Sequence, residues 1–267
     1  MNDKHIRKIE ELSMNAWPSY KIELYDKWLI RFSHQYTYRT NCVEQIGPSE
    51  IPIPEKISYC EQIYSDYGTP CSFKISPVIP QSFDDMLKEK GYEKKHVTNV
   101  MTMSLNNYRP SCDTGVQVTV NDKITDKWIM QLFNLNGTTN PTHLSIVPSM
   151  FKAIPKKTIV AGVVKDGRMA ASGLGILDRD DLGVYAIYTD AGERRSGYAR
   201  AICDTIINTG IRMGARYSYL QVVYGNEPAI NLYESLGYKY DYTYWFRSKN
   251  IVRQSARLSK DGGNDCR

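Results

Sequence analysis

A strand that runs into a helix through Arg194-Arg195-Ser196-Gly197-Tyr198-Ala199 constrains this chain more than any other feature. The preceding residues 184–188 are β-branched and aromatic, and the apolar residues that follow recur at helical spacing. At such a junction several backbone N–H groups point the same way, and the helix dipole adds partial positive charge. Gly197 lets a ligand approach the backbone, and the two arginines add full charge. The junction therefore predicts a pocket for a phosphorylated ligand.

A second pattern follows nearer the C-terminus. Residues 219–223 are typical of another strand, and Asn226 then opens a short helix that ends in Tyr233-Glu234-Ser235-Leu236-Gly237-Tyr238. Arg-x-x-Gly-x-Ala, followed by the Asn and Tyr-x-x-Leu-Gly-Tyr, resembles the GNAT superfamily of N-acetyltransferases. The resemblance covers residues 116–247 and weakens in the N-terminal half. Two departures are Ala199, where a Gly is common, and Glu193, which adds negative charge beside the arginines.

The resemblance implies acetyl-CoA as co-substrate. Backbone N–H groups of the loop would bind its pyrophosphate, and the strand before the loop would pair with the pantetheine arm. The residues implied as acetyl-CoA ligands are Ile187, Thr189, Arg194, Arg195, Ser196, Gly197, Tyr198, Ala199 and Asn226.

Tyr233 is the candidate general acid. In the family the matching tyrosine lies beside the thioester sulfur, and a phenol of pKa about 10 can protonate a thiolate of pKa about 8.5. The structural alternatives are core packing for Tyr233 and an ordinary helix N-cap for Asn226. No residue stands out as the general base. The candidates beside the strand are Asp181, Tyr185, Tyr188 and Asp190.

Composition argues against several other classes of protein. Hydrophobic content of 42% and charged content of 24% are typical of a globular protein with a sizeable core. Much of the net charge of +5 comes from residues 248–267, which hold five cations and two anions, so we expect no nucleic-acid partner. The six cysteines form no C-x-x-C pair and have no histidine at ligand spacing, which predicts free thiols and no metal. Without a signal peptide or a membrane-length apolar run, we expect a cytoplasmic protein with no membrane partner.

The element pattern predicts an α/β fold with a mixed sheet. In the second half, the order strand, two helices, three strands, loop, helix, strand, helix, strand matches the GNAT acetyltransferase fold. The first half is also mixed α/β, and its Leu87-to-Tyr92 segment resembles Leu236-Gly237-Tyr238. It is either a degenerate GNAT-like copy or an accessory domain. The predicted division is residues 1–106 for the N-terminal domain, 107–115 for a linker, 116–247 for the GNAT domain and 248–267 for a flexible basic tail.

The sequence thus predicts an acetyl-CoA-dependent N-acetyltransferase acting by direct attack on the thioester. Its acceptor would be a small-molecule amine, an amino acid or an aminoacyl compound. We expect the cleft between strands 183–189 and 217–223, with the first half and the closing strand 240–247 on the acceptor side. The alternatives are a protein N-terminal acetyltransferase and a non-catalytic acyl-CoA sensor, which needs the loop but not Tyr233. An edge strand leaves a homodimer open.

Overall fold

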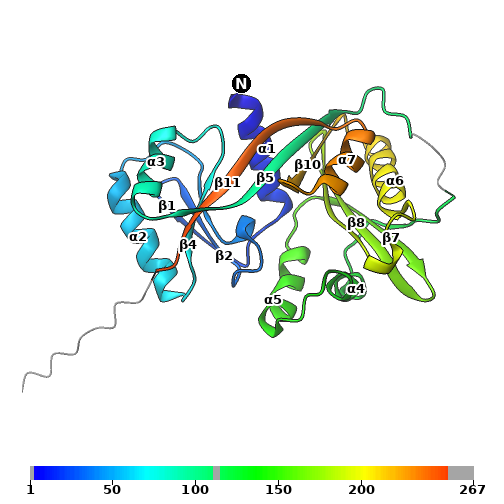
Figure 1. Ribbon diagram of the computed structural model, residues 1–267, viewed down its shortest axis with the longest axis horizontal. Helices are drawn as coiled ribbons and strands as arrows, with labels where there is room; N and C mark the ends of the chain where they lie inside the picture. Colours follow the sequence, from blue (N-terminus) through cyan, green and yellow to red (C-terminus); the bar gives the residue numbers. More distant parts are fainter. Residues whose placement is uncertain (1–2, 111–114, 252–267) are drawn as a thin grey trace, which may run out of the picture.

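A computed structural model describes residues 3–110 and 115–251 (Figure 1). The first half comprises α1 (Asp3–Ala16), β1 (Lys21–Tyr25), β2 (Trp28–Phe32), η1 (Tyr38–Thr40), β3 (Val43–Gln45), α2 (Ile53–Asp66), β4 (Cys71–Ile75), α3 (Gln81–Glu89) and β5 (Glu93–Ser104). The second half comprises β6 (Thr119–Asn121), α4 (Asp126–Asn136), α5 (Pro141–Lys152), β7 (Lys157–Lys165), β8 (Arg168–Asp178), β9 (Asp181–Thr189), η2 (Ala191–Glu193), α6 (Tyr198–Arg212), β10 (Tyr217–Val223), α7 (Glu227–Ser235) and β11 (Lys239–Lys249). The predicted α/β class with a mixed sheet is confirmed.

The strands of the described residues form one eleven-stranded sheet, in the order β1-β2-β3-β4-β11-β5-β10-β9-β8-β7-β6. The last strand of each half is exchanged. β11 pairs with β4, β5 pairs with β10, and β5 and β11 also pair with each other, always antiparallel. Figure 1 shows β5 and β11 running side by side across the middle of the molecule. Each half therefore completes the sheet of the other.

The topology repeats from either side of the exchanged pair. In the first half, the antiparallel strands β1, β2 and β3 lead through α2 to β4, which is parallel to β3. In the second half, β7, β8 and β9 lead through α6 to β10, which is parallel to β9. This order supports the interpretation of the first half as a GNAT-like copy. That interpretation and the domain boundaries stay predictions.

Helices cover both faces of the sheet. In β7, Ile159 packs with the core under α6 and α7, whereas its neighbour Val160 packs with the core under α4 and α5. Because successive strand residues point to opposite faces, these two pairs of helices lie on opposite faces. Helix α1 packs against β5, β10 and β11 through Ile6, Ile9 and Leu12, so it braces the exchanged strands.

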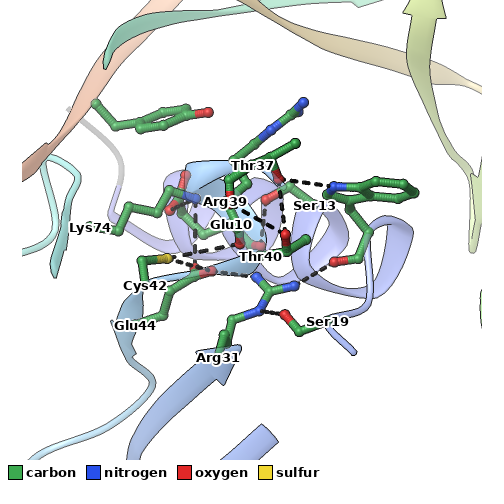
Figure 2. Close-up of polar contacts among 12 residues, drawn as sticks. Glu10, Ser13, Ser19, Arg31, Thr37, Arg39, Thr40, Cys42, Glu44 and Lys74 are labelled. Carbon is green, nitrogen blue, oxygen red and sulfur yellow. Dashed lines mark hydrogen bonds and ion pairs between the residues drawn. The ribbon is translucent and has the colours of Figure 1, made fainter. Parts of the chain in front are cut away.

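Buried charges tie α1 to the first-half strands (Figure 2). Lys74 of β4 lies 2.8 Å from Glu10 of α1 and 3.6 Å from Glu44 of β3, and Arg31 of β2 binds Glu44 at 2.5 Å. The Tyr242 hydroxyl of β11 donates to Glu10 Oε1 at 2.6 Å. Burial acts to raise the pKa of Glu44, but Lys74 and Arg31 outweigh it, so the net pKa is lowered. The charges therefore compensate one another inside the junction between the halves.

The structure departs from the sequence-based expectations mainly at the ends of the chain and at one edge of the sheet. The edge strand β1 was not predicted, although its burial alternates as in a half-exposed strand. Strand β11 continues to Lys249, so Ser248 and Lys249, which were expected in the basic tail, belong to the sheet. Residues 252–267 of that tail and 111–114 of the expected linker lie outside the described residues.

Four of the six cysteines lie in the described residues, and all four are free and buried, as predicted. They are Cys42, Cys60, Cys71 and Cys203. Burial raises the pKa of the Cys60 and Cys203 thiols to about 12, so both stay protonated and unreactive near neutral pH. Cys112 and Cys266 lie outside the described residues.

Helix α6 lies close to β8 because two glycines of that strand have no side chain. A Cβ on Gly173 would lie 2.4 Å from Ile202 Cγ2 and 2.8 Å from Ile187 Cδ1. A Cβ on Gly175 would lie 2.6 Å from Ile206 Cγ2. The close packing of α6 on the sheet thus depends on the two glycines of β8.

We expect Gly173→Ala to lower the free energy of unfolding by about 1–3 kcal/mol, because the added methyl overpacks the contact with α6. The control is Gly162→Ala in β7, whose Cβ would meet its nearest atom, Met169 Cε, at 3.5 Å. Urea denaturation of the two variants measures the difference. Equal stability of the two variants would contradict close packing at Gly173.

Candidate functional site

Strand β9 leaves its neighbour halfway along its length. Residues 181–184 pair in parallel with residues 217–220 of β10, and the pairing ends there. On the other side, a bulge in β9 sets Ala186 and Ile187 opposite the single residue Gly173 of β8. Ala186 has a φ of +51°, and its carbonyl accepts a 3.0 Å hydrogen bond from Ser172 Oγ. A bulge bends its strand, and beyond Val184 the second half of β9 has no backbone pairing with β10.

The arginine loop follows directly on the diverging strand. Asp190 accepts a hydrogen bond from Gly192 N–H at 2.9 Å, and the loop then passes through Arg195 at φ +66° and Gly197 at φ +77°. The first backbone bond of α6 runs from Ala201 N–H to the Gly197 carbonyl, so the amides before Ala201 precede the helical pattern. Arg194, Arg195, Ser196 and Gly197 are exposed, and a Cβ on Gly197 would have no atom within 4 Å. The loop is thus an open cradle of N–H groups and cations.

The negative charge of Glu193 is neutralised locally. Lys165, at the end of β7, lies 2.9 and 3.0 Å from the two Glu193 oxygens, and this bond raises the pKa of Lys165. Together with Arg168 and Asp190, these residues line a cavity of about 320 Å³ beside the loop. Because Lys165 compensates the charge of Glu193, the loop keeps the positive charge of Arg194 and Arg195.

Tyr233 of α7 is 8% exposed and packs in the core with α6. Burial raises its pKa, with smaller contributions from Cys203 and Tyr188. Cys203 of α6 belongs to the same core cluster as Tyr233, and Ile187 of β9 packs against that cluster. Within the described residues the Tyr233 hydroxyl forms no hydrogen bond, and its oxygen is not fully buried. The phenol is therefore protonated and available at the end of β9 where the strands diverge.

The other residues expected at the site occupy different places. Ile187 lies in the β9 bulge and Thr189 beyond it, Tyr198 and Ala199 form the first turn of α6, and Asn226 is exposed at the start of α7. The Asn226 side chain makes no capping hydrogen bond, so it is not the side-chain N-cap considered above.

Two of the candidate bases have structural roles. Asp181, at the far end of β9 from the bulge, lies 2.6 Å from Lys8 of α1, and burial raises its pKa. Asp190 caps the η2 turn. On β9, burial raises the pKa of Tyr185 to about 12, and its hydroxyl donates to Tyr219 at 2.8 Å, so it is a poor base near neutral pH. Tyr188 remains at the site without an assigned proton-transfer role.

A second cavity, of about 80 Å³, lies against β9 between the two halves. The second half contributes Phe151 of α5 and the β9 side chains around the bulge, and the first half contributes Trp17, Tyr36, Thr37 and Arg39. Sequence reasoning missed these first-half residues, because no spacing pattern marks them. No residue of β11 lines this cavity, and β11 is exchanged into the first-half sheet, so the expected role of strand 240–247 in lining the acceptor side stays a prediction.

The comparison with known proteins decides the family. Residues 4–246 match the protein family described as "Probable histone acetyltransferase Rv0428c C-terminal". The chain belongs to this family, and it is a GNAT N-acetyltransferase. The match covers both halves, so the first half is part of the family's fold rather than an unrelated addition.

Three relatives of this acetyltransferase are informative. It is 26% identical over 235 residues to an uncharacterized N-acetyltransferase, YobR, of Bacillus subtilis, covering 87% of this chain and 94% of YobR. It is 32% identical over 104 residues to the [ribosomal protein bS18]-alanine N-acetyltransferase of Escherichia coli, covering 39% of this chain and 64% of that enzyme. A tandem GNAT protein from the clavulanic acid biosynthesis pathway shares the fold with a TM-score of 0.60 at 11% identity, covering 84% and 76% of the two chains.

Membrane-spanning helices and metal-binding clusters are both missing from the part of the chain that the structure describes. In residues 3–110 and 115–251 no helix is long and apolar enough to cross a membrane. In the same residues no group of three or more His, Cys, Asp or Glu side chains is placed to hold a metal ion.

We expect Ala186→Val to lower the free energy of unfolding by about 1–3 kcal/mol, because a β-branched side chain strongly disfavours the positive φ of the bulge. Ala186→Gly serves as the control, since glycine adopts this φ freely and should leave stability close to that of the natural chain. Guanidinium denaturation followed by circular dichroism measures both. A valine variant as stable as the glycine variant would show that the bulge is not held in this conformation.

Proposed function

We propose that this acetyltransferase transfers the acetyl group of acetyl-CoA to the primary amine of a small molecule, an amino acid or an aminoacyl compound. The observation that carries the proposal is that Tyr233 belongs to the core cluster against which Ile187 of β9 and Tyr198 of α6 pack, and these two residues flank the cationic loop. GNAT enzymes of this kind use acetyl-CoA as donor. A bound thioester would supply the activated acetyl group.

The loop residues fit the pyrophosphate of acetyl-CoA. The N–H groups of the loop, which precede the first helical hydrogen bond of α6, would provide donors, and Arg194 and Arg195 would provide charge. Gly197 leaves room because nothing lies within 4 Å of its absent Cβ. Ile187 and Thr189 would offer the unpaired edge of β9 to the pantetheine arm, and Asn226 would contact the coenzyme from the start of α7.

In the proposed reaction the neutral amine attacks the thioester carbonyl carbon, a C–N bond forms, and the C–S bond breaks. Tyr233 gives its proton to the leaving sulfur, and the acylated nitrogen loses one proton to water, so charge and protons balance. Because burial raises the pKa of Tyr233, the phenol keeps its proton across the pH range in which the amine is neutral. An α-amine with a pKa near 8 then needs little help from a protein base.

We also propose that the first half is a degenerate copy of the GNAT fold that no longer binds the coenzyme. The repeated topology and the match of the tandem GNAT protein support this reading. Trp17, Tyr36 and Arg39 of this half would then shape the acceptor side. A cytoplasmic location and a homodimer remain expectations from the sequence.

A protein N-terminus is the second candidate acceptor. It is favoured by the similarity to the bS18-alanine acetyltransferase, whose named substrate is a ribosomal protein. A non-catalytic acyl-CoA sensor is the alternative outside catalysis. A thiol-release assay with acetyl-CoA and a panel of amines, amino acids and peptides separates the three.

We expect Tyr233→Phe to lower kcat by about 100-fold, because the leaving thiolate loses its proton donor. Its dissociation constant for acetyl-CoA should stay within about twofold of the natural value, since the loop is untouched. Stopped-time thiol release and calorimetric titration measure the two quantities. Unchanged turnover would exclude Tyr233 as the acid.

The matched control for this variant is Tyr238→Phe. Tyr238 is also buried and packs edge-to-face on Tyr233, but its hydroxyl bonds to Ser218 at 2.6 Å. The control removes a neighbouring phenol hydroxyl without removing the proposed acid. It should lose some stability and keep kcat within about threefold. An equal loss of kcat in both variants would indicate packing rather than proton transfer.

We expect Arg194→Gln and Arg195→Gln each to weaken acetyl-CoA binding by about tenfold at low salt, because each removes a charge that would face phosphate. The loss should shrink as ionic strength rises, since salt screens these exposed charges. Exposed Arg212, at the far end of α6, provides the control variant Arg212→Gln. Binding that is equally tight in the loop variants and the control would remove the loop from the coenzyme site.

A further inference from the structure

The cavity against β9 has an unusual charge distribution. Its lining includes the aromatic side chains of Trp17, Tyr36, Tyr185 and Tyr188, and its only charged residue is Arg39. The lining contains no Asp or Glu. An acceptor whose remote end is cationic, such as a polyamine or a lysine side chain, would find no counter-charge here.

Arg39 is held in place without being neutralised. Its Nη1 donates to Gln221 Oε1 of β10 at 2.6 Å, and the Tyr244 hydroxyl donates to the same oxygen at 3.2 Å. Among the described residues no carboxylate lies within ion-pair distance of Arg39, whereas Arg31 and Lys74 nearby are paired. In Figure 2 the Arg39 guanidinium points away from the Arg31–Glu44 pair. A half-buried guanidinium fixed by a neutral amide is ready for an anion.

The cavity adjoins the proposed reaction centre. Tyr188 lines the cavity, and the preceding residue of β9, Ile187, packs against the core cluster that contains Tyr233. Because β9 and β10 no longer pair beyond Val184 and Leu220, no backbone ladder between these two strands separates the cavity from a thioester held on the other face there.

We propose that Arg39 binds the carboxylate of an amino-acid acceptor whose amine is the acetylated group. This inference rests on the proposed function and narrows it. A carboxylate can take two hydrogen bonds from a guanidinium, which an amide of the same shape cannot match in charge. A peptide N-terminus has an amide in place of that carboxylate, so the inference favours a free amino acid over a protein acceptor. The small cavity volume suits an acceptor of this size.

The first test uses the natural chain alone. Each common amino acid and its α-amide are assayed as acceptors at saturating acetyl-CoA, with rates corrected for the fraction of neutral amine. For an amino acid that the enzyme acetylates, we expect kcat/KM to exceed that of the corresponding α-amide by about tenfold or more. Equal values for the pair would overturn the role of Arg39.

The second test asks whether Arg39 causes the preference. Arg39→Gln should remove it, bringing the two values within about threefold, mainly through a higher KM for the amino acid. Arg39→Lys keeps the charge but not the planar fork, and should retain part of the preference. Arg212→Gln should retain all of it. An intact preference in Arg39→Gln would overturn the inference, and the amide rate of that variant reports whether it is folded.

A failure of the proposed function is distinguishable from a failure of this inference. If no amine is acetylated although acetyl-CoA binds, the transferase assignment to small amines fails. Calorimetric titration of the amino acids into the chain saturated with CoA then decides the inference separately. Binding that the amides lack and that Arg39→Gln abolishes supports an Arg39 carboxylate site, and absence of such binding overturns it.

Discussion

The antiparallel contact between β5 and β11 is the constraint from which the other features of this molecule follow. Each of these strands closes the sheet of the half to which it does not belong, β5 against β10 and β11 against β4. Neither half can complete its sheet alone, and helix α1 packs across the shared strands. The two halves are therefore held at a fixed relative position. That position brings Trp17, Tyr36 and Arg39 of one half against the β9 bulge of the other.

The site depends on a local interruption of the pairing between β9 and β10. Parallel β9 and β10 pair over four residues and then separate, because the bulge at Ala186 bends β9 away. The separation leaves β9 with a backbone edge that does not pair with β10 beyond Val184. Immediately beyond, Gly197 adopts a left-handed conformation and starts α6, so the cationic loop continues from the same strand. One strand thus leads from the cavity lined by Arg39 to the loop of Arg194 and Arg195.

What the sequence could predict was local. The loop, the strand before it and Tyr233 follow from short patterns whose physics is contained in a few neighbouring residues. The Asp166-Gly167 turn between β7 and β8 is a local pattern of the same kind, since Asp-Gly is typical of a tight hairpin and both residues have positive φ. The exchange of β5 and β11 was beyond such reasoning, because strand partners far apart in the sequence leave no periodic signal. The sequence analysis missed Arg39 for the same reason, because the place of Arg39 in the cavity depends on the exchange of β5 and β11.

The first half shows why a repeated fold need not repeat a function. Its parallel strands β3 and β4 pair at only one residue pair, Val43 with Phe73, and so diverge as β9 and β10 do. Beyond that point, however, Glu44 and Lys74 meet in buried ion pairs completed by Glu10 of α1. Removing one member of such a group leaves a buried uncompensated charge and costs about 3–5 kcal/mol, so the group is hard to dismantle once formed. A pantetheine arm would have to displace these charges, whereas the cleft of the second half presents an open backbone edge. Under the proposed function, the polar junction that secures α1 would leave coenzyme binding to the second half and the acceptor side to the first half.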